Sequence, residues 1–176
     1  MLSFRDINKP ISFTDSETMC LKSIHRRLRH ATADEPINLD PEYQRDHVWT
    51  DEQAENFMGH VIEGGAVPVI IVNRDLSHGR PDEVVDGKQR LTAVARWVDG
   101  EIPARLSDGR EVYLKDFTEA DQRYVLSYSG PTMTIKYVVL DEADVLDLYI
   151  RLNRGGTVHS KEEIDRVRKM REGLNK

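Results

Sequence analysis

Residues 84–98 read VVDGKQRLTAVARWV, and this stretch constrains both fold and chemistry more than any other. Two β-branched residues lead into Asp86 and Gly87, and apolar residues at helical spacing follow at once. The pattern predicts a strand, a tight turn and a helix. The first backbone N–H groups of a helix lack partners within it, so a glycine entrance beside cationic side chains predicts an anion site, most often for phosphate.

Each residue of the motif at 86–90 suits that chemistry. Gly87 permits the turn and lets a phosphate approach the backbone. Lys88 and Arg90 can neutralise phosphate oxygens, and Gln89 can donate or accept a hydrogen bond. Asp86 can hold Mg²⁺ or accept a proton from an attacking hydroxyl. The alternative is that Asp86 caps the helix and the cations are surface charges.

Composition predicts a single domain with its own hydrophobic core. The chain has 176 residues, of which 32 % are charged and 39 % apolar. No apolar run approaches the roughly 20 residues that span a membrane, and the N-terminal stretch lacks a signal-peptide pattern. Cys20 is the single cysteine, which excludes an internal disulfide and a multi-cysteine metal site. We interpret it as a small buried hydrophobe and expect a cytoplasmic setting, in a bacterium or a phage-infected host cell.

The charge balance argues against binding nucleic acid over the whole surface, because the formal net charge is −6. One local basic strip stands out, HRRLRH at residues 25–30. Arg26, Arg27 and Arg29 either form a solvated helix face or contact the phosphate backbone of DNA. The sequence leaves both interpretations open.

The order of the expected elements predicts an α+β fold with mixed strand order and helices on the outside. The helices are expected over 16–31 with Ser16 as N-cap, 50–62 with a capping box at Thr50 and Gln53, 88–98, 118–127 and 142–152, with a last helix after a second capping box at Ser160. The strands are expected at 69–72, 84–85 and 132–140, with a hairpin turn at 107–110 between two short strands.

Several familiar site types are absent. The chain has no Gly-x-x-x-x-Gly-Lys-[Ser/Thr], no His-Glu-x-x-His and no Gly-x-Ser-x-Gly. The six histidines are scattered, and they lack cysteine partners for a structural zinc. These absences exclude a Walker-type NTPase, a zinc protease and a serine hydrolase of the α/β type.

Three spaced motifs carry a family resemblance. PEYQR at 41–45, GGAVP at 64–68 and DGKQR at 86–90 occur in an order that resembles the ParB/sulfiredoxin-like superfamily, whose α+β fold has a small mixed sheet flanked by helices. More narrowly, the chain resembles the branch with the motif Asp-Gly-Gln-Gln-Arg, which includes the N-terminal domain of GmrSD-type modification-dependent restriction enzymes. RLNRGG at 151–156 also resembles that branch.

The resemblance spans roughly residues 37–165 and implies three parts of the chain. Residues 1–36 are expected as an N-terminal helical extension, 37–165 as the nucleotide-binding domain and 166–176 as the end of a C-terminal helix. The motif departs from the family at Lys88, where the branch usually has Gln and ParB itself has Glu. Sulfiredoxin chemistry is not expected, because no cysteine lies beside the motif.

The resemblance implies a site for a nucleoside triphosphate and Mg²⁺. The catalytic residues are then Asp86, which also holds the metal, Lys88 and Arg90. The residues expected to bind the nucleotide and its phosphates are Tyr43, Gln44, Arg45, Gly65, Pro68, Gly87, Gln89, Arg151 and Asn153. For some of these a structural role stays open: Tyr43 and Trp49 either stack on a base or anchor their segment on the core, and Arg151 and Asn153 either line the pocket or cap a helix.

Three functions remain for such a site. The first is phosphoryl transfer from an NTP to water or to a hydroxyl, for example on a modified DNA base, in a bacterial or phage system of DNA modification or defence. The second is a nucleotide-gated binding module without turnover. The third is a nuclease or restriction component, which the acidic balance and the lack of a His-Asn-His-type domain disfavour.

Overall fold

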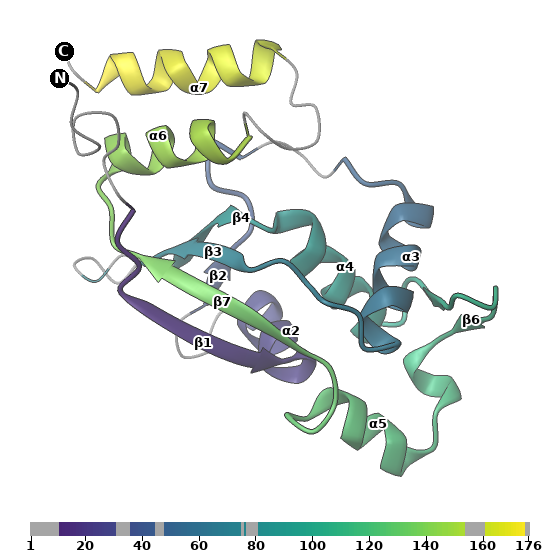
Figure 1. Ribbon diagram of the computed structural model, residues 1–176. Helices are drawn as coiled ribbons and strands as arrows, with labels where there is room; N and C mark the ends of the chain where they lie inside the picture. The colour runs from purple at the N-terminus through teal and green to yellow at the C-terminus, as the bar shows by residue number, and fades with distance from the viewer. Residues whose placement is uncertain are drawn as a thin grey trace, which may run out of the picture.

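The computed structural model describes residues 11–30, 36–44, 48–74, 76, 81–153 and 161–174. Its centre is a five-stranded mixed sheet with the order β1-β7-β3-β4-β2 (Figure 1). The β1/β7 and β3/β4 pairs are antiparallel, whereas β3/β7 and β2/β4 are parallel. The strands are β1 (Asp15–Cys20), β2 (Ile37–Asn38), β3 (Ile70–Asn73), β4 (Asp82–Asp86) and β7 (Thr132–Val138), and β5 (Ala104–Arg105) with β6 (Glu111–Val112) forms a separate hairpin.

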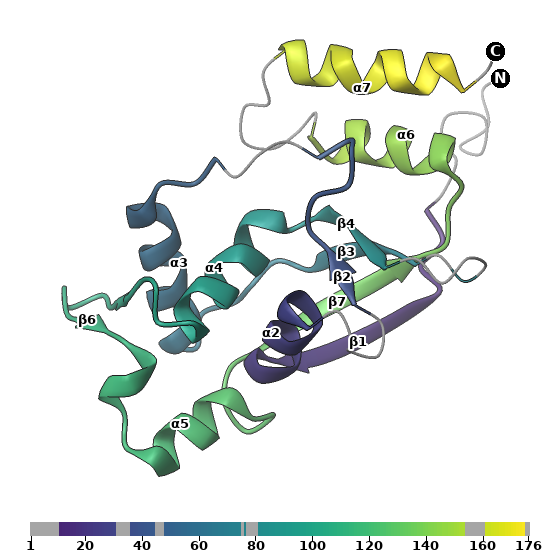
Figure 2. The same ribbon diagram turned by 180° about the vertical axis from the view of Figure 1, so that it is seen from behind.

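Helices cover both faces of this sheet. In Figure 2 α6 and α7 are stacked on one side, and α2, α3 and α4 lie on the other. The helices are α2 (Leu21–Arg29), α3 (Asp51–Ile62), α4 (Lys88–Val98), α5 (Glu119–Leu126), α6 (Glu142–Asn153) and α7 (Lys161–Gly173), with a 3₁₀ turn η1 (Leu114–Asp116) before α5. The predicted α+β class, a small mixed sheet flanked by helices, is therefore confirmed.

Side chains that alternate in direction along the central strands contribute to two hydrophobic cores, one on each face of the sheet. Val84 faces the core shared with α2, α3 and α4, whereas its neighbour Val85 faces α6 and α7. Ile70 and Ile71 divide in the same way on β3. Successive strand residues point to opposite faces, so a strand stretch covered on both sides is apolar at successive positions rather than at alternate ones. This explains the continuous apolar runs in the sequence.

The helix predicted over 16–31 is wrong in its first part. Residues 15–20 form β1, which pairs with β7 from Asp15–Tyr137 to Cys20–Thr132, and α2 begins only at Leu21. A partner strand more than a hundred residues away has overridden the local helical pattern. Cys20 is 4 % exposed at the end of this strand, as expected of a small buried hydrophobe. The division of the chain at residues 36 and 165 stays a prediction.

Most other elements lie where the local signals place them. The capping box at α3 is present, since Thr50 Oγ1 accepts a hydrogen bond from Gln53 N and Gln53 Oε1 accepts one from Thr50 N. Thr118 caps α5 through Asp121 N, and the 107–110 turn joins β5 to β6. Ser160 and its capping box lie outside the described residues. Among the described residues, no helix is long and apolar enough to cross a membrane.

Candidate functional site

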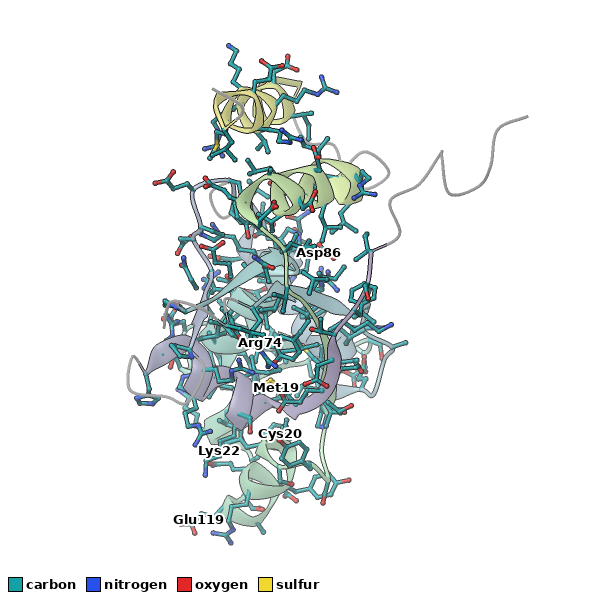
Figure 3. All side chains as sticks on the ribbon, turned by 90° about the vertical axis from the view of Figure 1, so that its left-hand side faces the viewer. Met19, Cys20, Lys22, Arg74, Asp86 and Glu119 are labelled. Carbon is teal, nitrogen blue, oxygen red and sulfur yellow. The ribbon has the colours of Figure 1, made fainter. Side chains whose placement is uncertain are left out.

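The predicted strand, turn and helix at 84–98 are confirmed. Asp86 ends β4, Gly87 is the N-cap of α4 with φ 108° and ψ 9°, and Lys88 begins the helix. This left-handed conformation favours glycine. A Cβ on Gly87 would also lie 2.4 Å from Ile70 Cδ1. Gly87 has no side chain that could cap α4. Figure 3 shows the neighbouring Asp86 just below α6.

Arg90 joins two of the predicted motifs. Its Nη2 donates to Asp86 Oδ2 at 2.7 Å, and its Nη1 donates to the carbonyl oxygens of Pro68 at 2.5 Å and Val69 at 3.3 Å. The Arg90 side chain is 12 % exposed and that of Asp86 is 40 % exposed. The guanidinium thus fastens the end of the GGAVP segment and the carboxylate to the first turn of α4. Gly65 lies at the end of α3, where its N–H donates to His60 O.

Gln89 connects the motif to the segment before α3. Its Oε1 accepts hydrogen bonds from the backbone N–H groups of Val48 and Trp49, both at 3.3 Å. The Trp49 ring packs edge-to-face on Phe57, with centroids 5.4 Å apart. This contact supports the anchoring role of Trp49. The sequence did not indicate the Gln89 contact, because its two ends are 40 residues apart.

Lys88 is nearly buried, at 7 % exposure, and its Nζ lies 2.6 Å from Asp40 Oδ1. Asp40 was not among the predicted site residues. It belongs to a turn after β2, in which its backbone N–H donates to Asn38 Oδ1 at 2.9 Å. An Asp-Pro pair is a turn signal in the sequence, but nothing local to it indicates a lysine partner. The pair brings a third segment to the start of α4.

Tyr43 and Gln44 face β4. The Tyr43 side chain is buried, packs edge-to-face on Tyr149 and donates to Val84 O at 3.4 Å. Burial, helped by the charge of Glu83, raises the pKa of Tyr43 above its ordinary value. Gln44 Nε2 donates to the carbonyl oxygens of Val84 and Val85 at 3.0 and 2.9 Å. Both side chains fasten their segment to the sheet, and Arg45 lies outside the described residues.

Arg166 of α7 was missed by the sequence analysis. Its guanidinium donates to three consecutive carbonyl oxygens, those of Glu42 at 2.8 Å, Tyr43 at 3.4 Å and Gln44 at 3.2 Å. The last described helix therefore holds residues 42–44 of the PEYQR segment. A lone arginine on a charged helix carries no sequence signal for such a contact.

The end of α6 makes contacts within its own last turns. Arg151 is exposed, and its Nε lies 3.4 Å from Asp147 O. Asn153 Nδ2 donates to Tyr149 O at 2.8 Å. These contacts support the capping interpretation for both residues. Figures 1 and 3 place this helix above the junction of β4 and α4, so a role as a pocket wall stays a prediction.

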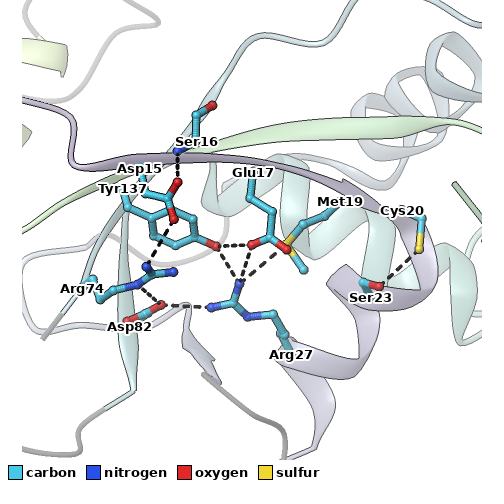
Figure 4. Close-up of polar contacts among 10 residues, drawn as sticks. All are labelled: Asp15, Ser16, Glu17, Met19, Cys20, Ser23, Arg27, Arg74, Asp82 and Tyr137. Carbon is cyan, nitrogen blue, oxygen red and sulfur yellow. Dashed lines mark hydrogen bonds and ion pairs between the residues drawn. The ribbon is translucent and has the colours of Figure 1, made fainter. Parts of the chain in front are cut away.

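The interpretation of residues 25–30 as one exposed basic strip is wrong for Arg27. Its side chain is 4 % exposed and lies in a polar network between α2 and the sheet (Figure 4). Its guanidinium donates to Tyr137 Oη at 2.6 Å and to Asp82 Oδ2 at 3.0 Å. Arg29 lies at the surface and pairs with Asp99 at 2.8 Å. DNA contact through Arg26 and Arg29 stays a prediction.

Arg74, the residue directly after β3, completes the same network. Its guanidinium carbon lies 3.8 Å from the Tyr137 ring centroid, and its Nε is 3.6 Å from Asp82 Oδ2. Burial raises the pKa of Tyr137 to about 12, although the facing Arg27 opposes the shift. The network is therefore a buried tie between α2, β3, β4 and β7.

A cavity of about 720 Å³ lies at the other end of β4 from Gly87. Asn73, Arg74, Pro81 and Glu83 line it together with the start of α6, and none of residues 86–90 is among its lining residues. The described residues contain no cluster of three or more His, Cys, Asp or Glu side chains that could hold a metal ion. The side chains of residues 86–90 thus meet around the start of α4, away from this cavity, whereas Glu42 and Tyr43 of the PEYQR segment line it.

A protein-family model matches residues 28–167, and its description is GmrSD restriction endonuclease, N-terminal domain. The chain belongs to this family. The resemblance drawn from the three motifs is therefore confirmed. A search of curated proteins finds no match.

Among solved structures, the GmrSD N-terminal domain described here is similar to the C-terminally truncated chromosome-partitioning protein ParB from Caulobacter crescentus, complexed with CTP-gamma-S. The two share 14 % sequence identity at a TM-score of 0.44. The match covers 82 % of this chain and 56 % of that one.

Proposed function

We propose that this GmrSD N-terminal domain binds a nucleoside triphosphate at the start of α4 and transfers its terminal phosphoryl group to water or to a hydroxyl acceptor. The context is a DNA restriction or modification system, and one candidate acceptor is a hydroxyl on a modified DNA base. Family membership supports the restriction context. The ParB structure was solved with a CTP analogue, which is a property of that protein.

One observation carries the proposal: the Asp86 carboxylate lies beside a helix start that is suited to anions. Gly87 opens α4 without a side chain over its first turn, and Arg90 holds Asp86 at 2.7 Å. Helix N–H groups and cations stabilise phosphate oxygens, while a carboxylate beside them can orient or deprotonate an acceptor. The chemistry is then positional and electrostatic.

The residues present fit Mg²⁺ only in combination with the nucleotide. Mg²⁺ is usually held by one or two carboxylates together with substrate phosphates and water. Asp86 can supply one carboxylate, since its side chain is 40 % exposed. When bound with the nucleotide, the metal would neutralise charge on the phosphates.

A nucleotide-gated module without turnover is the second candidate. Three side chains of the motif each hold a different segment: Lys88 holds Asp40, Gln89 holds the backbone at Trp49, and Arg90 holds the backbone at Pro68. A nucleotide that displaced any of these contacts would change the placement of that segment. This convergence supports gating as strongly as it supports catalysis.

The test uses the full chain with each γ-labelled NTP and Mg²⁺, with plain or hydroxymethylated DNA or without DNA. Label on DNA supports the kinase and released phosphate supports the NTPase. Retained NTP binding without either product supports the gated module. Absence of binding to all the NTPs at millimolar concentration would contradict the proposal.

Asp86→Asn is the informative variant, because it preserves size while removing the charge. We expect it to abolish turnover without unfolding the chain. The matched control is Glu119→Gln, which removes one exposed carboxylate at the far end of the molecule (Figure 3). Wild-type turnover in Asp86→Asn would remove Asp86 from the catalytic residues.

A further inference from the structure

We propose that Asp40 competes with the incoming triphosphate for Lys88, so that nucleotide binding releases the turn after β2. The inference rests on the proposed function, since it assumes a triphosphate at the start of α4. It adds a built-in regulator to that site: an acidic side chain of the same chain that holds the lysine until a stronger anion arrives.

The two partners differ sharply in their access to solvent. The Lys88 side chain is 8 % exposed and that of Asp40 is 78 % exposed, although Nζ and Oδ1 are only 2.6 Å apart. The carboxylate thus lies on the outer side of the pair. Solvent and dissolved anions therefore reach Asp40 far more readily than they reach Lys88.

An exchange of partners suits this arrangement energetically. A nearly buried ammonium group is destabilised when it loses a close carboxylate, so an incoming anion is favoured as a replacement for Asp40. A triphosphate carries more negative charge than one carboxylate, and at the start of α4 it would also meet the positive end of the helix dipole. Asp40 would repel that triphosphate while it stays in place.

The surrounding structure allows Asp40 to move without disturbing the sheet. On one side, β2 pairs with β4 at Ile37–Asp82 and Asn38–Glu83. On the other side, Gln44 is fastened to the carbonyl oxygens of β4. Between these anchors, the Asp40 N–H donates to Asn38 Oδ1 at 2.9 Å, a contact that lies within the turn itself. Motion can therefore be confined to Asp40, because Leu39 packs on the core and the buried Pro41 accepts a hydrogen bond from Gln44 N–H at 2.9 Å.

The first experiment is calorimetric titration of the full chain with inorganic tripolyphosphate and with NTP. Asp40→Asn is expected to bind both about three- to tenfold more tightly than wild type, the range typical of one partly exposed charge interaction. The gain should be absent when Asp40→Asn is combined with Lys88→Met. Glu119→Gln serves as the control for a general loss of negative charge and should leave affinity unchanged.

The outcomes separate the two proposals. If wild type binds NTP and a folded Asp40→Asn binds it equally or more weakly, Asp40 does not compete, and the inference fails while the proposed function stands. If wild type binds neither tripolyphosphate nor any NTP, both fail. Circular dichroism melts establish that each variant is folded.

A measurement on the unmodified protein keeps the inference testable if Asp40→Asn does not fold. Amide hydrogen exchange at residues 38–40 is expected to become faster on addition of triphosphate, because the turn loses its tie to Lys88. Exchange in β4 at 82–86 should not become faster. Unchanged or slower exchange at residues 38–40 in the bound state would overturn the release of this turn.

Discussion

Arg27 and Asp82 form an ion pair of 3.0 Å in which the side chains are 4 % and 6 % exposed. The pair links α2 to the first residue of β4 beneath a segment that reads as a basic surface strip. Arg26, the preceding residue, is exposed. Neighbouring arginines in the same strip thus have opposite environments.

Arg27→Met is expected to lower the free energy of unfolding by about 1–3 kcal/mol, because the buried Asp82 carboxylate loses this closer cation and keeps the more distant contact with Arg74. Arg26→Met is the matched control and should change stability by less than about 0.5 kcal/mol. Urea denaturation measures both. Equal losses of stability in the two variants would show that the burial of Arg27 does not determine how much it stabilises the fold.

Gly87→Ala should destabilise the chain more than Gly100→Ala. Both glycines have positive φ, at 108° and 76°, so each alanine variant is strained by about 1–2 kcal/mol. At Gly100 nothing lies within 4 Å of an added Cβ, whereas at Gly87 the methyl group would meet Ile70. Urea denaturation compares the two variants. A smaller loss for Gly87→Ala would contradict the packing argument at the β4–α4 turn.

Trp49 should report nucleotide binding by fluorescence. Trp49 is partly buried, and its backbone N–H donates to Gln89 Oε1. Trp97 is fully buried, and its indole N–H donates to Val112 O. NTP addition is expected to change the emission of wild type, and Trp49→Phe should abolish that change. A signal that persists in Trp49→Phe would mean that the segment before α3 does not respond to the nucleotide.

The decrease in the free energy of unfolding at acidic pH should depend in part on Asp99. Burial acts to raise the pKa of Asp99, but hydrogen bonds from His25 and Arg29 outweigh it and lower the pKa below the ordinary 3.8. The unfolded chain therefore takes up this proton first as the pH falls. The stabilisation by Asp99 is present above about pH 4 and is lost as the pH falls through the folded pKa.

Melting temperatures of wild type and Asp99→Asn at pH 7, 5 and 3 test this dependence. The variant should be less stable at pH 7 and 5, and the difference should shrink towards pH 3. A difference that stays constant over this range would rule out the carboxylate charge as its source.

Arg166→Ala is expected to loosen residues 42–44, since it removes a guanidinium that three carbonyl oxygens share. Hydrogen bonds from a charged donor contribute about 1.5–3 kcal/mol. Hydrogen exchange at 42–44 should rise, while Arg168→Ala, which removes an exposed partner of Asp165, should leave it unchanged. Equal exchange in the two variants would show that α7 does not hold this segment.

Local sequence signals predicted the elements that depend on near neighbours. The turn at Gly87, the capping box at Thr50 and the hairpin at 107–110 each rest on residues a few positions apart, and all three are present. The motifs also identified the family. The same local reasoning failed at residues 15–20, where the edge strand forms by pairing with β7.

The local sequence by itself determines where α4 begins. A glycine at the end of a strand, followed directly by helix-forming residues, acts through neighbours within one helical turn. The residues that contact this first turn of α4 do not follow from the local sequence. Asp40 meets Lys88, Trp49 meets Gln89 and Pro68 meets Arg90 only because the sheet and α3 bring distant segments to one place. Contacts between residues 20 to 50 positions apart depend on the packing of the whole chain, which no local pattern encodes.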